Sequence, residues 1–432
     1  MLNRHTVSAF ALWLLFIAVH LVLGLLNLQG PGNPFGDVTI VYAGWAQQAY
    51  ASGIVVGVDM PWVYPLLAIV PILASVTFGI GHIGATWLAL VMLLNLVALG
   101  FLTRWGRSRA GVIIGWWWLV FLLALGPIAL GRIDAVTVAV ALVGVRLLSR
   151  HPRAAGIVLA CATWIKVWPA ALLLAAFITL RDRWAIAIAA AGTTATVVVF
   201  ALLAGSGMNI FSFVSEQTGR GIQIESPVAA FWLWQAVAGV PDTFIYYDAS
   251  ILTFQVTGAG VQLAAALMTP LLGVVILVIA VLGVRATRAG SSTLGVFSMV
   301  SLALVTALIV VNKVGSPQFV GWLAVPIVLG LLTARAEGSL RFRKPAVLAL
   351  VIAALTQLVY PYFYDQLLAA DPIMVAILTV RNVLLLALLV WAIVQLVRLG
   401  SRSSASGEHT PQPFFSTPYS PPLERPTAKE SA

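Results

Sequence analysis

The sequence predicts an all-α membrane protein with many spans, and three observations lead to this fold class. Of the 432 residues, 61% are hydrophobic and only 9% are charged, a composition that excludes an ordinary soluble protein. Apolar runs near the length of about 20 residues that crosses a bilayer recur along the chain. Basic residues cluster between these runs, as expected for cytoplasmic loops. We therefore expect a polytopic membrane protein of about 12 transmembrane or re-entrant helices, with both termini in the cytoplasm.

Other classes are excluded by the same composition. The net charge of +10 would suit a nucleic-acid-binding protein, but the basic residues do not line one polar face. The single cysteine, Cys161, excludes an internal disulfide and a cysteine metal site within one chain. Acids and histidines do not recur at metal-ligand spacing, so we expect no metal and no cofactor other than a lipid substrate. The first apolar run, 9–26, lacks a small-x-small cleavage pattern, so we interpret it as an uncleaved span.

The first outer loop is the longest feature of the N-terminal half. A span over 9–26 leads outward to residues 27–82. Within this loop 38–52 has the pattern of a short amphipathic helix, and 64–79 contains two prolines, so both are expected to lie at the interface. If 64–79 crossed the membrane, the arginines at 104–109 would fall outside, against the positive-inside rule. Spans over 84–103, 110–129 and 135–149 follow.

Two half-length segments interrupt the series of spans. Residues 154–165 and 170–180 are each about half a span long and are separated by Lys166, Trp168 and Pro169. The flanking arginines favour two short helices that leave the cytoplasm and return, with a non-helical tip that must face protein or a wet cavity. Spans over 184–204, 262–284, 293–311, 319–334, 345–360 and 373–398 complete residues 1–400, the expected membrane domain. The outer loop 205–260 is expected to hold its own interfacial helix, and 401–432, rich in Ser and Pro, a disordered cytoplasmic tail.

The distribution of charge supports this topology. Within residues 1–400, the loops placed outside hold every acid except Asp182 and Glu337, whereas most Lys and Arg residues fall inside. A miscounted span in the middle of the chain would destroy this asymmetry.

Four outer segments combine a charged or amide residue with a Gly or Pro turn at a helix end: 36–37, 131–134, 166–169 and 313–318. Charges at membrane depth are costly, and they usually pair with one another or line a substrate pathway. A cation there can bind a polyprenyl phosphate, and a nearby acid can deprotonate a sugar hydroxyl. Inverting transfer needs only one carboxylate base, because phosphate leaves without a strong acid, whereas a glycosidase needs two carboxylates. The pattern therefore suggests glycosyl transfer at the outer face of the cytoplasmic membrane.

The same segments carry a resemblance to a known family. The matching pieces appear in this order: Gly36-Asp37 with Tyr42 and Tyr64-Pro65, GRIDAVTVAVALVGV at 131–145, IKVWPAALL at 165–173, Glu225-Ser226-Pro227, and 315–318 before Trp322. With them the chain resembles the GT-C membrane glycosyltransferases, and most closely glycosyltransferase family 87, the PimE-like polyprenyl-phosphate-mannose-dependent α-mannosyltransferases of actinobacteria.

The resemblance implies a GT-C fold and transfer of mannose from a polyprenyl-phosphate donor to a glycolipid or lipid-linked glycan of the cell envelope. The family's catalytic base is an aspartate of the first outer loop, which maps best onto Asp37, with Asp59 as the alternative. Candidates for binding the donor phosphate are Arg132, Lys166, Lys313 and Arg381. Candidates for other substrate contacts are Asp134, Tyr64, Glu225, Gln318 and Trp168. Many family members that extend mannans have a His pair where this chain has Gln318-Phe319, which leaves the acceptor open.

Several candidates also have a simpler structural explanation. Asp37 could cap the helix that follows it, because Asp is a favoured N-cap. Asp59 precedes Met60-Pro61 and could be a turn residue. Arg132 and Asp134 could form a surface ion pair with each other or cap a helix.

Lys313 could extend its ammonium to the membrane interface, and Arg381 could bind carbonyl groups of another helix. Most tryptophans belong in an interfacial belt, although Trp168, Trp232 or Trp234 could stack on a sugar or an isoprenoid.

A functional alternative from another class is a secondary transporter, with Lys166 and Arg381 as coupling charges in broken helices. Transporters commonly have two related halves, and this sequence has no internal repeat; its long outer loops also suit an enzyme better. A third reading is a flippase or a non-catalytic lipid-binding relative, which would not need Asp37.

Overall fold

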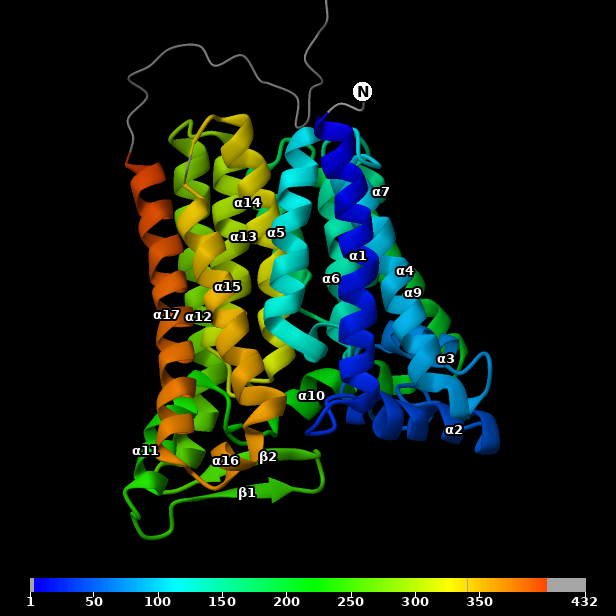
Figure 1. Ribbon diagram of the computed structural model, residues 1–432, viewed down its shortest axis with the longest axis vertical. Coiled ribbons are helices and arrows are strands. Elements are labelled where there is room, and N and C mark those ends of the chain that lie inside the picture. Colours follow the sequence, from blue (N-terminus) through cyan, green and yellow to red (C-terminus); the bar gives the residue numbers. More distant parts are fainter. Residues whose placement is uncertain (1–3, 340, 402–432) are drawn as a thin grey trace, which may run out of the picture.

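The apolar runs become long helices that pack side by side in the computed structural model, which describes residues 4–339 and 341–401 (Figure 1). Within this part, nine helical segments are long and apolar enough to cross a membrane. Together with three shorter helices, α6, α7 and α8, they make up the expected set of about 12, and the all-α polytopic membrane class is confirmed. The helices are α1 (Arg4–Gln29), α4 (Ile83–Thr103), α5 (Arg109–Leu125), α6 (Ile133–Leu147), α7 (Pro152–Ile165), α8 (Ala170–Thr179), α9 (Arg183–Leu203), α12 (Val261–Arg288), α13 (Thr293–Val310), α14 (Ala324–Ala336), α15 (Arg343–Gln357) and α17 (Pro372–Gly400).

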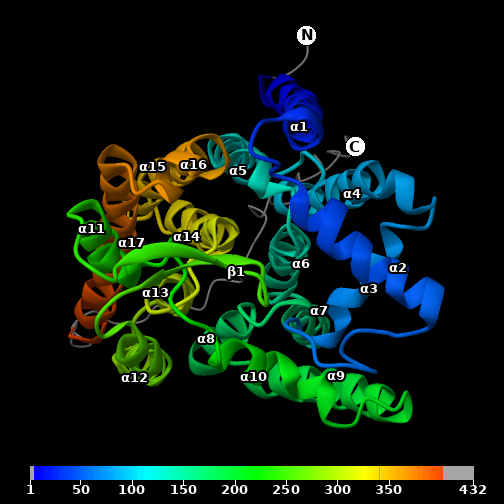
Figure 2. The same cartoon turned by 90° about the horizontal axis from the view of Figure 1, so that it is seen from below.

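The helices differ in how deeply they are buried. Nearly every side chain of α13 is buried, and α14 beside it is almost as enclosed. By contrast, α9 and α12 lie at the edge of the bundle and leave most of their apolar surface exposed (Figure 2). A helix that is apolar on all sides and exposed in this way is stable in lipid rather than in water.

The break between α7 and α8 lies where the sequence predicts it. Lys166 ends α7 in an extended conformation, with φ −152° and ψ 137°. Pro169 follows, its φ of −64° already suited to a helix, and α8 begins at the next residue. The two short helices therefore present Lys166 at a non-helical tip, as expected.

One end of the bundle, which we call the loop end, carries the interfacial elements (Figure 1). The predicted segment 38–52 corresponds to the π-helical turn η1 (Asp37–Tyr42) and α2 (Ala43–Ser52). The predicted segment 64–79 contains the 3-10 turn η2 (Leu66–Ala68) and α3 (Ile69–Ala74), which is too short to span. The start of α1 and the end of α17 both lie at the opposite end of the bundle (Figure 1). That the termini lie in the cytoplasm stays a prediction.

The loop 205–260 contains more secondary structure than expected. It contains α10 (Ser212–Thr218) and α11 (Ala230–Val237), and in addition a β-hairpin of β1 (Phe244–Asp248) and β2 (Thr253–Thr257). The strands are antiparallel, with Phe244 opposite Thr257 and Tyr246 opposite Gln255. Aromatic and β-branched residues favour strands, and this signal was missed in the sequence. The short helix α16 (Tyr364–Leu368) was missed as well. The predicted tail, 401–432, lies outside the described residues from 402 onward.

Candidate active site

Asp37 lies at the loop end, at the start of η1, and faces the N-terminus of α6. Its Oδ2 atom lies 2.9 Å from Nε of Arg132, and 36% of the Asp37 side chain stays exposed. The side chain caps no helix. The capping explanation of Asp37 is therefore wrong, and the carboxylate is instead half of an ion pair.

Arg132 is the buried half of this pair, with 7% of its side chain exposed. Its Nη1 atom donates to the carbonyl oxygens of Pro34 at 2.6 Å and Gly131 at 2.8 Å, and Nη2 donates to the Tyr360 hydroxyl at 2.8 Å. Burial by itself would lower the pKa of Arg132, but the nearby Asp37 carboxylate together with the hydroxyls of Tyr360, Tyr42 and Tyr64 outweighs it, and the pKa lies above its ordinary value. Arg132 is therefore a permanent cation that joins three segments of the chain.

Asp134, two residues after Arg132, forms a second ion pair with Lys166. Oδ2 of Asp134 lies 3.7 Å from Nζ of Lys166, with 3% and 14% of the two side chains exposed. Oδ1 of Asp134 accepts a hydrogen bond of 2.7 Å from the indole nitrogen of Trp322. Arg132 and Asp134 thus each pair with a residue from another part of the chain, and the expectation that they pair with each other is wrong.

Aromatic rings surround the ammonium group of Lys166. Its Nζ atom lies 4.5 Å from the centre of the Tyr64 ring and 5.4 Å from that of Phe319, within the range of cation–π attraction. Among the described residues, none accepts a hydrogen bond from it. Phe319 in turn stacks on Trp322 with ring centres 4.2 Å apart. The lysine is thus held by rings and by a loose ion pair, and its N–H groups stay available to a ligand.

Two further aromatic contacts fix this arrangement. The Trp168 indole stacks on Trp322 with ring centres 5.6 Å apart, and its nitrogen donates to the Thr137 hydroxyl at 2.9 Å. The buried Tyr42 hydroxyl accepts a 3.1 Å hydrogen bond from the backbone nitrogen of Ile133, which ties η1 to the start of α6. Burial raises the pKa of both Tyr42 and Tyr64, so both rings stay neutral at ordinary pH.

A third polar group lies beside the first pair. The Glu225 carboxylate accepts a 2.6 Å hydrogen bond from the Tyr364 hydroxyl, and the Tyr364 ring packs edge-on against Tyr360, the partner of Arg132. Burial raises the pKa of Glu225. Arg381, from α17, donates through Nη2 to the backbone oxygen of Glu225. Arg381 therefore binds a carbonyl group, as its structural explanation expected, but that carbonyl belongs to a loop and not to another helix.

The loop 312–318 packs directly on this polar group. A Cβ atom on Gly315 would lie 2.1 Å from the backbone nitrogen of Ser226, so the two loops approach as closely as glycine permits. The Lys313 carbonyl accepts a 2.9 Å hydrogen bond from the Gln223 nitrogen, and the Lys313 side chain is buried. Lys313 therefore belongs to the wall of the site.

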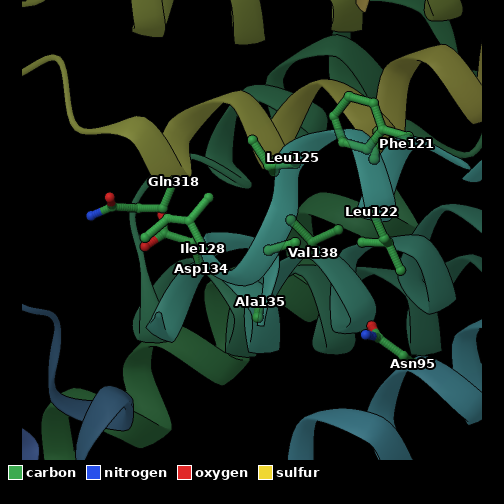
Figure 3. A pocket seen from close by; sticks show the side chains of 12 residues that line it. Asn95, Phe121, Leu122, Leu125, Ile128, Asp134, Ala135, Val138 and Gln318 are labelled. Atoms are coloured by element: carbon green, nitrogen blue, oxygen red, sulfur yellow. The ribbon is translucent and has the colours of Figure 1, made fainter. Parts of the chain in front are cut away.

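A cavity extends from the second ion pair into the bundle. It holds about 360 Å³ of empty space, counted with its open mouth. Asp134 and Gln318 lie at one end and Asn95 at the other, with apolar walls between them (Figure 3). Phe121, Leu122 and Val138 are among the side chains of these walls.

Asp59, by contrast, stands apart from these groups. It is exposed, and its Oδ2 atom accepts a 2.7 Å hydrogen bond from the backbone nitrogen of Val55. This bond closes a local turn, which is the structural explanation that the sequence offered for Asp59.

Comparison with known protein families identifies the family of this chain. The model of glycosyltransferase family 87 matches residues 62–311, more than half of the chain. The chain belongs to glycosyltransferase family 87. Membership in this family makes the protein a membrane glycosyltransferase and confirms the resemblance seen in the sequence. It also disfavours the alternative of a secondary transporter.

The solved structures include one that is similar to this family 87 chain. It is the apo crystal structure of ArnT from Cupriavidus metallidurans, with 16% sequence identity and a TM-score of 0.40, covering 91% of this chain and 77% of that chain. No curated protein matches the sequence.

Sequence reasoning missed several residues of this family 87 site. Tyr360 and Tyr364 were not among the candidates from the sequence, and Trp322 was named only as the end of a motif. The signal for Trp322 was its place four residues after Gln318, one helical turn away, but nothing in the sequence links Tyr360 to Arg132. No group of three or more His, Cys, Asp or Glu residues in the described part of the chain is placed to hold a metal. Independence from metal stays a prediction.

Proposed function

We propose that the protein catalyses inverting transfer of mannose from a polyprenyl-phosphate donor to a glycolipid or lipid-linked glycan at the outer face of the cytoplasmic membrane. One observation carries the proposal. An accessible acid and a cation with unused N–H donors lie in two neighbouring ion pairs at the loop end. Family membership supports the reaction class, and the resemblance of the sequence supports the donor and the sugar.

Asp37 is the proposed base. One of its oxygen atoms is paired with Arg132, and the other accepts no hydrogen bond from a described residue. A carboxylate held in this way can accept the proton of an acceptor hydroxyl while that oxygen attacks the anomeric carbon. Asp59 remains the alternative, but its side chain already closes a turn.

Lys166 is the proposed ligand of the donor phosphate. Its ammonium can leave the 3.7 Å contact with Asp134 and donate to phosphate oxygens, which stabilises the negative charge of the leaving group. Before the donor binds, Asp134 holds the lysine, and Trp168 holds its aromatic surroundings. Lys313, Arg381, Tyr64, Glu225 and Gln318 stay candidates for secondary contacts with the phosphate or the sugars.

The experiment is transfer of radiolabelled mannose from polyprenyl-phosphate mannose to lipid acceptors, in membranes that contain equal amounts of each variant. We expect transfer by the wild type and by the control Asp365→Asn, which changes an exposed acid of α16, and loss of transfer in Asp37→Asn. Loss in Asp59→Asn with retention in Asp37→Asn would move the base to Asp59. A wild type that transfers no mannose, but does transfer another sugar from the same lipid phosphate, would refute mannose alone.

A further inference from the structure

We propose that Arg132 is a positioning residue for the base Asp37 and does not bind the donor phosphate, which is left to Lys166. This inference rests on the proposed function and gives Arg132 a role different from the one that the sequence suggests. Three observations support it. The N–H donors of Arg132 are almost all used, its partners come from the segments around Asp37, and the N–H donors of Lys166 are unused.

The guanidinium of Arg132 has almost no donor left for a ligand. Asp37, Pro34, Gly131 and Tyr360 together use four of its five N–H groups. Arginine binds phosphate best through two parallel N–H donors, and only one N–H, on Nη2, has no partner in the described residues. A phosphate that bound Arg132 in the bidentate manner would have to displace a partner from a side chain that is only 7% exposed.

The partners of Arg132 all help to place Asp37. Pro34 lies three residues before Asp37, so the guanidinium holds both the backbone that leads into η1 and the carboxylate at its start. Tyr360 comes from the turn η8 (Leu358–Tyr362), which also contacts the same loop, because a Cβ on Gly32 would lie 2.6 Å from the Pro361 oxygen. Arg132 thus fixes the loop, the acid and η8 against α6, and it leaves the second carboxylate oxygen of Asp37 without a partner among the described residues.

In contrast to Arg132, Lys166 has N–H donors that are not used in hydrogen bonds. Its ammonium makes one loose contact with a carboxylate and two contacts with ring faces, none of which uses an N–H donor at hydrogen-bond distance. A phosphate oxygen therefore replaces a weak interaction at Lys166, whereas at Arg132 it would replace a strong one. Because a phosphate displaces the partner of Lys166 at a lower free-energy cost than the partners of Arg132, we assign the phosphate to Lys166.

The test compares Arg132→Lys, Lys166→Gln and the control Arg146→Lys, in purified protein that transfers mannose from polyprenyl-phosphate mannose. Arg146 lies on the same helix, α6, at the end away from the loops. A lysine at 132 keeps the charge but cannot span the four partners, so we expect kcat to fall about 100-fold, the effect of a misplaced catalytic group. The donor KM, and inhibition by free polyprenyl phosphate, should stay within about twofold of wild type. Lys166→Gln should raise the donor KM and weaken inhibition by free polyprenyl phosphate, each by about tenfold or more, because this variant loses a charge-assisted hydrogen bond to the phosphate.

A second pair of measurements covers the case in which Arg132→Lys fails to fold. Tyr360→Phe removes one hydrogen bond to the guanidinium and should lower kcat severalfold with an unchanged donor KM. Added guanidinium ion should restore part of the kcat of Arg132→Ala, which a purely structural defect would not allow.

The outcomes separate the two proposals. If the wild type transfers sugar, and the Arg132 and Tyr360 variants raise the donor KM and weaken inhibition by polyprenyl phosphate as Lys166→Gln does, the positioning role is wrong and the proposed function stands. A wild type that transfers no sugar from any polyprenyl phosphate refutes the proposed function, and the positioning role with it.

Discussion

The two ion pairs at the loop end are built from the same kinds of residues in opposite ways. In the pair Asp37–Arg132 the cation is buried and the acid is 36% exposed, at a distance of 2.9 Å. In the pair Asp134–Lys166 the acid is buried and the cation is the more exposed member, at 3.7 Å. In each pair additional hydrogen bonds hold the buried member. Arg132 donates to a backbone carbonyl and to the Tyr360 hydroxyl, and Asp134 accepts from the Trp322 indole.

This difference suggests how one small region offers both chemical roles. A buried charge that is well paired is costly to move, because separation leaves it uncompensated in a medium of low polarity. For the more exposed member, the free-energy cost of changing partner is smaller, since water or substrate can solvate it. The first pair therefore presents an acid to the substrate, and the second presents a cation.

The largest expected effect comes from the exposed acid of the first pair. Asp37→Asn removes the proposed base and should lower the rate of transfer by about 10²–10⁴-fold, the usual contribution of general base catalysis. The donor KM should change little, because the phosphate lies at the other pair. Initial rates over a range of donor concentrations measure both quantities, and a wild-type rate in this variant would remove Asp37 from the chemistry.

Lys166, the more exposed member of the second pair, comes next. Lys166→Arg keeps the charge but places a larger planar group between the rings of Tyr64 and Phe319, so we expect partial transfer activity, above that of Lys166→Gln. The exposed Lys344 lies outside the loop end, and Lys344→Gln is the matched control, with wild-type kinetics expected. Equal activity of the Gln and Arg variants at position 166 would show that charge has no role there.

A smaller effect should follow from the buried acid of the second pair. Trp322→Phe removes the indole N–H that donates to Asp134 and leaves a buried carboxylate oxygen without this partner. We expect stability to fall by about 1–3 kcal/mol and the donor KM to rise severalfold, because Lys166 loses its fixed counterion. Thermal unfolding in detergent and steady-state kinetics check the two parts. An unchanged donor KM would mean that Asp134 does not position Lys166.

The smallest effect concerns Glu225, an acid whose carboxylate meets a hydroxyl instead of a cationic side chain. Burial raises its pKa above the ordinary value of 4.5, so the folded protein binds this proton more tightly than the unfolded chain does. The resulting stability is complete below pH 4.5 and is lost as the pH rises through the folded pKa. Glu225→Gln is neutral at every pH, so its Tm relative to wild type should increase as pH rises above 4.5. A constant difference in Tm would contradict a raised pKa.

Much of this architecture could be predicted from the sequence. The lengths of the apolar runs and the positions of the arginines defined the spans, because lipid requires continuous helices and cations favour the cytoplasm. The break at Lys166 followed from two runs too short to cross. Asp37, Arg132, Asp134 and Lys166 were candidates for the same reason, as charges at helix ends in a chain with few charges.

The pairing of these charges was decided only by the tertiary structure. Residues two apart at the start of a helix point in different directions, so Arg132 and Asp134 diverge toward different neighbours. Those neighbours, Asp37, Tyr360 and Trp322, come from distant parts of the chain, and no local pattern brings them together. Local patterns in the sequence therefore identify the charged residues and the helix ends at which they lie. Long-range packing of η1, η8 and the start of α6 decided which charge is buried and which stays available to a substrate.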